Sequence, residues 1–271
     1  MEGGILIMKT RVFVMGDIHG NFKPIKDFWE RNKEEIEQEQ SYNVLILLGD
    51  SGLNYHLNPM DRGLKKRLSK LPFTYFVIRG NHEERPSKVM ASNPEEWTTE
   101  FYFGNPVYVE KDFPNIKYAA DCLEVYYIPC GDSLLKTLVI PGAYSVDKHY
   151  RLQNDWNWFE GEQLTLEEMD RGLRDIELMG YNCDLVLSHT CPSIFVPTDL
   201  FLPCIDQSTV DTSMERYLGH IEYKLNYRCW MWAHYHENRD YPRNDGKIKV
   251  MLTDSAVELS QVLKEDTIKL L

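Results

Sequence analysis

The sequence predicts an α/β protein in which two mixed β-sheets pack as a central sandwich flanked by helices. Strand-like and helix-like segments alternate in the N-terminal part of the 271-residue chain, which is typical of crossover helices and a mainly parallel sheet. Several short β-like runs follow between residues 101 and 140, and a second, mixed sheet packed on the first would accommodate them. Because no repeat, low-complexity tract or linker interrupts the sequence, we expect a single domain over residues 1–271.

The N-terminal elements are predicted from hydrophobic periodicity and from helix and turn signals. Three strands are predicted from apolar, β-prone runs, at residues 12–15, 44–48 and 75–78. Residues 22–40 carry apolar side chains at helical spacing and predict a helix, and Pro24 is tolerated in its first turn because no hydrogen bond is lost there. A basic helix is predicted near residues 60–70, and Leu71-Pro72 ends it.

The middle and the C-terminal part predict hairpins, two helices and further strands. Hairpins are predicted from four short runs separated by Pro, Gly and Asn, at residues 106–110, 116–119, 125–128 and 137–140. A capping-box pattern, Thr165 with Glu168, begins a helix that reaches Met179, and Gly180 suits its C-cap. The remaining predicted elements are a helix at 208–225 and strands at 185–187, 230–232, 248–252 and 257–262.

Composition and charge restrict the classes of function. Apolar residues make up 43% of the chain, which is typical of a globular protein, and no run of about 18 apolar residues predicts a membrane span. The formal net charge of −12 disfavours a protein that holds nucleic acid by its phosphate backbone. The six cysteines form no C-x-x-C pair and no export signal is recognised, so we expect reduced thiols in a cytoplasmic protein.

Five short polar clusters each follow a predicted strand. They read Asp17-Ile18-His19, Gly49-Asp50, Gly80-Asn81-His82-Glu83, Ser188-His189 and His234-Tyr235-His236. Strands that end in Asp, Asn and His would direct hard oxygens and imidazole nitrogens to one edge of a sheet, where open α/β sheets place their sites. The potential ligands gathered there suffice for two metal ions that share one carboxylate.

The residue types indicate a site for two divalent transition-metal ions (Mn²⁺, Fe²⁺/Fe³⁺ or Zn²⁺), because imidazole combined with carboxylate and amide oxygens suits these ions better than Ca²⁺. Asp50 suits a bridging carboxylate, and the terminal ligands would be Asp17, His19, Asn81, His189, His234 and His236. Two such ions polarise a phosphoryl oxygen and provide a bridging hydroxide that attacks phosphorus in line. His234 and His236 both reach the metals only if the backbone leaves regular strand geometry after Ala233.

Together the five clusters resemble the motifs of the calcineurin-like metallophosphoesterase superfamily, in the same order and over residues 16–236. The resemblance implies a four-layer α/β/β/α fold. It also implies the ligand sets, which are Asp17, His19 and His236 for the first metal and Asn81, His189 and His234 for the second, with Asp50 between them. His82 would lie beside the substrate, where an imidazole donates a proton to the leaving oxygen or holds a phosphoryl oxygen.

The sequence departs from the serine/threonine protein phosphatases of this superfamily, which continue Gly-Asp as Gly-Asp-x-x-Asp-Arg-Gly. Leu53 stands where the Asp that orients the catalytic His would be, and Asn54 stands where a phosphate-binding Arg would be. Asp61-Arg62-Gly63 follows much later, and we interpret it as part of the basic helix. These differences weaken the narrower prediction of a protein phosphatase.

Further substrate contacts are predicted by position alone. The stretch 142–151 follows a strand, and its cationic or titratable side chains, Lys148, His149 and Arg151, could close over a phosphate. The other candidates are Arg79, Tyr55 and His56. The aromatic cluster Trp156-Asn157-Trp158-Phe159 is interpreted as buried packing or a subunit contact in preference to a platform for a nucleobase.

We therefore expect a cytoplasmic, metal-dependent hydrolase of phosphomonoesters or phosphodiesters that acts on a phosphorylated small molecule or a phosphoprotein. One alternative is a metal-stabilised interaction module with weak or no turnover. Within enzymes, the alternatives are a serine/threonine-protein-phosphatase-like activity and a nuclease activity, which the net charge disfavours. The sequence makes no prediction of the native substrate or of the oligomeric state.

Overall fold

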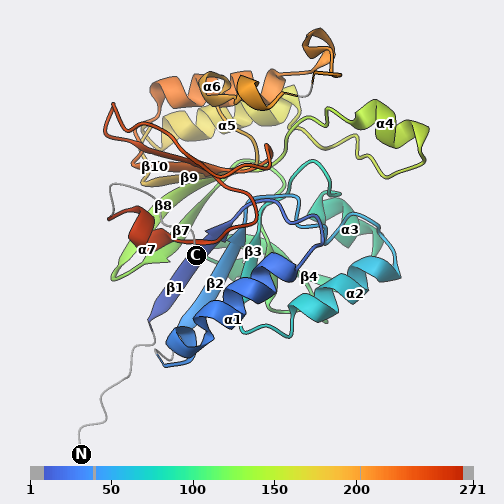
Figure 1. Cartoon of the computed structure of the whole chain (residues 1–271), viewed down its shortest axis with the longest axis vertical. Helices are drawn as coiled ribbons and strands as arrows, with labels where there is room; N and C mark the ends of the chain where they lie inside the picture. Colours follow the sequence, from blue (N-terminus) through green and yellow to red (C-terminus); the bar gives the residue numbers. More distant parts are fainter. Residues whose placement is uncertain (1–8, 39–40, 202, 265–271) are drawn as a thin grey trace, which may run out of the picture.

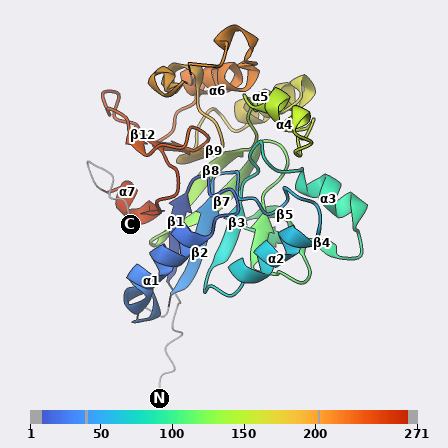
Figure 2. The same ribbon diagram turned by 45° about the vertical axis from the view of Figure 1, so that its right-hand side comes forward.

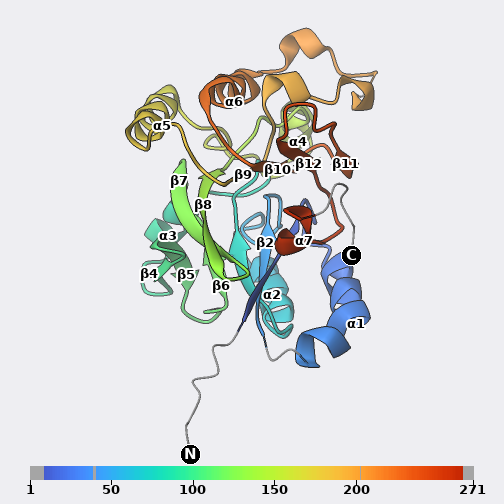
Figure 3. The ribbon, with the colours of Figure 1, turned by 90° about the vertical axis from the view of Figure 1, so that its left-hand side faces the viewer.

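Two mixed β-sheets lie face to face at the centre of the molecule, and helices cover the outer face of each sheet (Figures 1, 2 and 3). Helices α1 (Lys23–Gln38) and α2 (Pro59–Leu68) lie on one side of the sandwich, and α5 (Leu166–Leu178) and α6 (Ser213–Lys224) lie on the opposite side. The predicted order of four layers is therefore confirmed. This computed structural model describes residues 9–38, 41–201 and 203–264.

The first sheet has seven strands and combines the N-terminal half of the chain with a short strand near its C-terminal end. In spatial order the strands are β13 (Val257–Glu258), β1 (Thr10–Met15), β2 (Tyr42–Leu47), β3 (Thr74–Val77), β6 (Ile116–Tyr118), β5 (Asn105–Glu110) and β4 (Trp97–Tyr102). Strands β1, β2, β3 and β6 are parallel neighbours, whereas β13, β5 and β4 run antiparallel to the strand beside them.

The second sheet has six strands, four of which are parallel neighbours. In spatial order the strands are β11 (Arg239–Asp240), β12 (Ile248–Met251), β10 (Cys229–Trp232), β9 (Leu185–Ser188), β8 (Ser133–Ile140) and β7 (Glu124–Cys130). Strands β11 and β7 are antiparallel at its two edges. The β-like runs predicted between residues 101 and 140 are thus divided between the two sheets, and only β7 and β8 belong to the second.

Three apolar clusters fill the spaces between the four layers. Successive side chains of a strand face opposite ways, so Val14 of β1 faces the second sheet while Phe13 packs on Phe28 of α1 with ring centroids 5.0 Å apart. On the other side of the sandwich, Trp230 of β10 and Leu218 of α6 belong to a cluster between the second sheet and its helices. This packing fixes the relative positions of the strand ends.

Local signals set the ends of the helices. Asn58 begins α2 by accepting the backbone N–H of Met60, and Pro59 takes the first helical position. At α5, Thr165 accepts the N–H of Glu168, whose carboxylate accepts the N–H of Thr165, so the predicted capping box is confirmed. In the described ranges, none of the helices combines the length and the apolar character that crossing a bilayer would need.

The structure differs from the predicted elements in the strand at 257–262 and in the helix at 208–225. The strand predicted at 257–262 is wrong beyond Glu258, because α7 (Leu259–Val262) follows β13; a short apolar run does not by itself distinguish strand from helix. The helix predicted at 208–225 begins only at Ser213. The helix predicted at 22–40 is α1, and the end predicted for it lies outside the described residues. Elements that were not predicted are α3 (Pro86–Ser92), α4 (Lys148–Gln153), β4 and β11.

Candidate metal centre

The predicted ligands meet where the carboxyl ends of strands from both sheets come together. Loops after β1, β2 and β3 of the first sheet and after β9 and β10 of the second carry Asp17, His19, Asp50, Asn81, His189, His234 and His236. The ligands were expected to meet at one edge of a single sheet. This expectation is wrong, because loops from both sheets carry them. Backbone hydrogen bonds join these loops, from His19 N to Asp50 O at 2.7 Å and from Ala233 N to His189 O at 2.9 Å.

Four of these residues have a left-handed backbone. The φ angles are 45° at His19, 44° at Asp50, 72° at His234 and 54° at His236. Such a conformation is uncommon outside glycine and costs about 1–3 kcal/mol, and it is found mainly where a site requires it. The chain leaves strand geometry after β10, and His234 and His236 therefore both turn toward the cluster. This agrees with the expectation from the sequence that the backbone becomes irregular after Ala233.

Two glycines allow the loops to approach the cluster closely. Gly49 has a φ of 102°, and a Cβ at this position would lie 2.1 Å from Nδ1 of His189. A Cβ at Gly80 would lie 2.0 Å from Oδ1 of Asp50. Any other residue at either position would displace a side chain of the cluster, so the glycines that precede Asp50 and Asn81 are needed for its geometry.

The first group of ligand atoms comes from Asp17, His19 and His236, and these atoms all lie within 4.8 Å of one another. Nε2 of His236 is 3.0 Å from Nε2 of His19 and 3.2 Å from Oδ2 of Asp17. Asp17 is buried and the two imidazoles are exposed, so this group forms the open side of the cluster. One carboxylate and two imidazoles at this spacing fit a divalent transition-metal ion.

The second group comes from Asp50, His189 and His234, whose ligand atoms also lie within 4.8 Å of one another. Nε2 of His189 is 3.5 Å from Oδ2 of Asp50 and 2.8 Å from Oδ1 of Asn81, so the amide oxygen is directed to the same place. Asp50 forms a further such group with His19 and His82. Asp50 thus lies between two sets of donor atoms, an arrangement that fits two ions sharing a carboxylate.

Two buried carboxylates give the cluster a preference for positive charge. In the part of the chain that the structure describes, the ion-pair partners of Asp17 and Asp50 are histidines. Burial opposes the ionisation of Asp50, but His189 above all holds the pKa of this carboxyl well below its usual value. Burial also opposes the charging of His189, yet Asp50 and Asp17 raise its pKa to about 9. Burial and His189 lower the pKa of His234 to about 3, which leaves this imidazole neutral and able to bind a metal.

Hydrogen bonds from the surroundings orient two of the ligands. Nδ1 of His189 donates to the backbone carbonyl of Leu48 at 2.7 Å, which turns Nε2 toward the cluster. Nδ2 of Asn81 donates to Oγ of Ser145 at 2.9 Å, which turns Oδ1 toward the cluster, and Ser145 in turn donates to Glu162. Sequence reasoning missed Glu162, and no local pattern could have identified it, because its link to Asn81 joins distant parts of the chain.

His82 and Arg151 lie together at the edge of the cluster. Nε2 of His82 is 3.9 Å from Oδ2 of Asp50. The guanidinium of Arg151, which is fully buried, donates from Nη2 to His82 Nε2 at 3.0 Å and to Ser145 Oγ at 2.6 Å. The ring centroid of Tyr55 is 6.1 Å from that of His82. Of the substrate contacts predicted by position, Arg151 and Tyr55 therefore flank the imidazole.

Other candidates from the sequence lie apart from the cluster. Arg79 is buried and donates to the backbone carbonyl of Glu162 at 2.8 Å, so its guanidinium is used within the fold. His149 is exposed on α4, and His56 packs on Tyr55 with ring centroids 4.9 Å apart. Within the predicted aromatic cluster, Phe159 is buried as expected, whereas Trp156 is 53% exposed.

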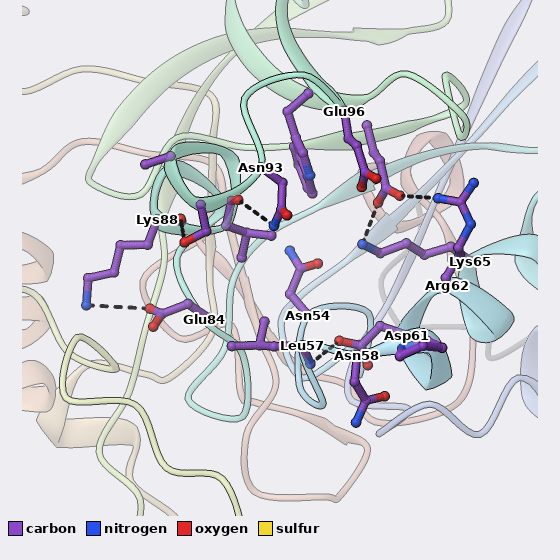
Figure 4. A pocket seen from close by; sticks show the side chains of 16 residues that line it. Asn54, Leu57, Asn58, Asp61, Arg62, Lys65, Glu84, Lys88, Asn93 and Glu96 are labelled. Carbon is purple, nitrogen blue, oxygen red and sulfur yellow. Dashed lines mark hydrogen bonds and ion pairs between the residues drawn. The ribbon is translucent and has the colours of Figure 1, made fainter.

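Figure 4 shows a cavity of about 740 Å³. Among the described residues, none of the seven predicted metal ligands lines this cavity. Both lysines of its lining are paired with glutamates of the same lining, with Lys65 Nζ 2.6 Å from Glu110 Oε2 and Lys88 Nζ 3.6 Å from Glu84 Oε1. Asp61 lines this cavity and accepts backbone N–H groups of the loop before α2. The Asp61-Arg62-Gly63 motif therefore belongs to α2, as interpreted from the sequence.

A buried carboxylate, Glu83, holds the loops that follow β2 and β3. Its Oε1 accepts the hydroxyl of Ser51 and, at 2.9 Å, the N–H of Gly52, and its Oε2 accepts the N–H of Gly80 at 3.2 Å. Glu83 is 3% exposed, and burial raises its pKa. Sequence reasoning assigned no role to this residue, although it stands in one of the polar clusters.

Replacing Glu83 by alanine is expected to lower the free energy of unfolding by about 3 kcal/mol, because buried donors lose their acceptor and each unsatisfied donor costs about 1–3 kcal/mol. Urea denaturation followed by fluorescence measures the change. Glu95→Ala, at an exposed position, serves as the matched control and should stay within about 0.5 kcal/mol of the wild type. Equal unfolding midpoints for Glu83→Ala and the wild type would contradict the role assigned to Glu83.

Comparison with known proteins adds the following findings. A family model described as calcineurin-like phosphoesterase matches residues 10–238. The crystal structure of TT1561 of Thermus thermophilus is 12% identical and covers 96% of this chain and 97% of its own, with a TM-score of 0.52. A dimetal phosphatase from Danio rerio is 10% identical and covers 93% of each chain, with a TM-score of 0.48. No curated protein matches the sequence. At 12% identity, the likeness to TT1561 concerns the fold alone.

Proposed function

We propose that this chain cleaves phosphomonoesters or phosphodiesters at a two-metal centre. The premise is that the chain belongs to the calcineurin-like phosphoesterase family and is therefore a hydrolase of phosphoric esters. The observation that supports the proposal is the position of Asp50 between two groups of side chains that could hold a metal ion. The proposed ligands are Asp17, His19 and His236 for one ion and Asn81, His189 and His234 for the other, with Asp50 shared.

The metal ions, when bound, would polarise a phosphoryl oxygen and supply a nucleophile at neutral pH. The side chains around them would bind and orient the ester. Burial lowers the pKa of His82 to about 4, so its imidazole is neutral at pH 7, and Nε2 accepts the hydrogen bond from Arg151. A phosphoryl oxygen that enters beside Asp50 would replace this contact. It would accept a hydrogen bond from the Arg151 guanidinium and, once the imidazole proton has moved from Nδ1 to Nε2, a second one from His82. We therefore assign the binding of the phosphoryl group to His82 and Arg151.

The direct test is hydrolysis by the purified protein loaded with Mn²⁺, with p-nitrophenyl phosphate and its bis ester as substrates. We expect release of p-nitrophenol from at least one of them, loss of this activity after treatment with EDTA, and recovery when Mn²⁺ is restored. Preference for the monoester favours a phosphatase, and preference for the bis ester favours a phosphodiesterase. Failure to hydrolyse either ester, with two metal ions bound, would overturn the proposal in favour of an interaction module.

We further propose that the protein acts in the cytoplasm on a phosphorylated small molecule or a phosphoprotein. All six cysteines are free thiols, which supports a reducing compartment. The formal net charge of −12 opposes an extended contact with a nucleic-acid backbone. Leu53 is fully buried and its side chain could not orient His82 as the Asp of the serine/threonine protein phosphatases orients their His, which disfavours a catalytic arrangement like theirs.

A further inference from the structure

An apolar cavity opens directly beside the candidate metal centre. It has a volume of about 560 Å³, and His234 and His236 form part of its lining. Sites for small organic ligands typically have volumes of about 300–1,000 Å³. A phosphoester with its phosphorus at the metal cluster would therefore have room for its organic group in this cavity.

Hydrophobic side chains dominate the lining of the apolar cavity. They are Val146, Val196, Leu200, Phe201, Ile205 and Val210. Three charged residues of the lining already have partners within the protein. The contacts are Glu215 with the hydroxyl of Thr190 (2.7 Å), Arg216 with the hydroxyl of Thr212 (2.8 Å) and Asp211 with the backbone N–H of Ser213 (2.8 Å). An apolar ligand would lose contact with water here without breaking any of these bonds.

One wall of the apolar cavity comes from residues 193–201 and 203–212, a stretch of short 3₁₀ helices and turns between β9 and α6 that Figures 1 and 3 show in orange beside α6. This stretch is fixed to the second sheet. Asp199 accepts two hydrogen bonds from Arg239, at 3.0 and 2.7 Å, and Phe195 stacks on Trp232 with ring centroids 5.7 Å apart. The cavity is therefore formed before a ligand enters, which reduces the entropy lost on binding.

We propose that the apolar cavity binds the organic group of the phosphoester and that the substrates are esters of an apolar alcohol or phenol. The proposal rests on the proposed function, because it requires the phosphoryl group to lie at the metal centre. A sugar or another hydroxylated group should bind less tightly, since most of the surface that the cavity exposes is apolar and the hydroxyls would exchange water for fewer partners.

The test compares phenyl phosphate with 4-butylphenyl phosphate on the Mn²⁺-loaded protein, because the same aryl ester bond is broken and only the apolar chain differs. A buried methylene group is worth roughly a factor of four in binding. We expect kcat/KM to be at least about tenfold higher for the butylphenyl ester, mainly through a lower KM. The corresponding arylphosphonates, which are not hydrolysed, should show the same preference in their Kd values by calorimetry.

Two variants place an amide on the wall of the apolar cavity. Val146→Asn and Val210→Asn should each reduce the preference for the butylphenyl compound to about threefold or less, because the amide must lose water when the chain enters. Val146 is 45% exposed, so its replacement does not threaten the core. The matched control is Ile194→Asn, at an exposed position of the same stretch outside the lining, which should keep the full preference.

The outcomes separate this proposal from the proposed function. Equal kcat/KM values for the two phosphates and equal Kd values for the two phosphonates would overturn the cavity proposal, while hydrolysis of phenyl phosphate would still support the two-metal hydrolase. Lack of hydrolysis combined with tighter binding of the butylphenylphosphonate would overturn the proposed function and support the cavity. A preference that both cavity variants retain in full would show that another surface binds the chain, and it would overturn the cavity proposal.

Discussion

Asp50→Asn is expected to reduce kcat by at least about 10³-fold and to lower the metal content of the protein from two ions per chain. Asp50 is 1% exposed and lies between both groups of ligand atoms. Asparagine preserves the shape of the side chain but removes the negative charge that would offset the repulsion between two cations. The stabilisation of the transition state that two ions provide amounts to several kcal/mol, and each 1.36 kcal/mol corresponds to a factor of about ten in rate.

Steady-state kinetics and elemental analysis of the same sample measure the two effects of Asp50→Asn. The matched control is Asp155→Asn, because Asp155 also has a left-handed backbone, with a φ of 54°, but is exposed and lies outside the cluster. The control should keep both activity and metal content. Two bound ions and wild-type turnover in Asp50→Asn would refute the assignment of Asp50 as the shared ligand.

His82→Ala is expected to lower kcat by about 10²–10³-fold while both metal ions stay bound, because the imidazole would hold a phosphoryl oxygen and is not among the seven proposed ligands. The variant also removes the partner of Arg151, whose guanidinium donates to Nε2 of His82 at 3.0 Å. Part of the loss should therefore come from a phosphoryl group that is held less firmly. The measurement is kcat for p-nitrophenyl phosphate, together with the metal content.

A comparison of two esters tests the role assigned to His82. Because the imidazole is neutral and binds a phosphoryl oxygen in our proposal, the loss should be similar for p-nitrophenyl phosphate and for an alkyl phosphate, whose leaving group is far less acidic. A much larger loss for the alkyl ester would show instead that His82 protonates the leaving oxygen. The matched control is His220→Ala, on the exposed side of α6, which should retain full activity.

The positions of the site residues could be predicted because they depend on local signals. Apolar, β-prone runs define β1, β2, β3, β9 and β10, and within each sheet the parallel strands bring their carboxyl ends to the same edge. The prediction that His234 and His236 require an irregular backbone follows from the two-residue period of a strand alone. Sheet membership was harder to predict, since nothing in the run at 106–110 indicates which of the two sheets it joins.

The contacts that orient the site could not be predicted, because they join residues that are distant in the sequence. The hydrogen bonds from Asn81 to Ser145 and from Ser145 to Glu162 depend on how the two sheets pack. The same is true of the contact between Arg151 and His82. The apolar cavity was missed for a different reason, since its wall is a stretch of short 3₁₀ helices and turns without the periodicity on which sequence reasoning relies.

The division of the proposed ligands between two sheets has a consequence for the stability of the folded protein. His19 and His236 are 217 positions apart in the chain and meet at the open side of the cluster, so an ion bound there, as we propose, would act as a removable cross-link between the halves of the sandwich. Because an ion that binds only the folded chain shifts the folding equilibrium, resistance to heat and proteolysis would rise with the concentration of free metal. The supply of metal would thus regulate the lifetime of this protein as well as its turnover.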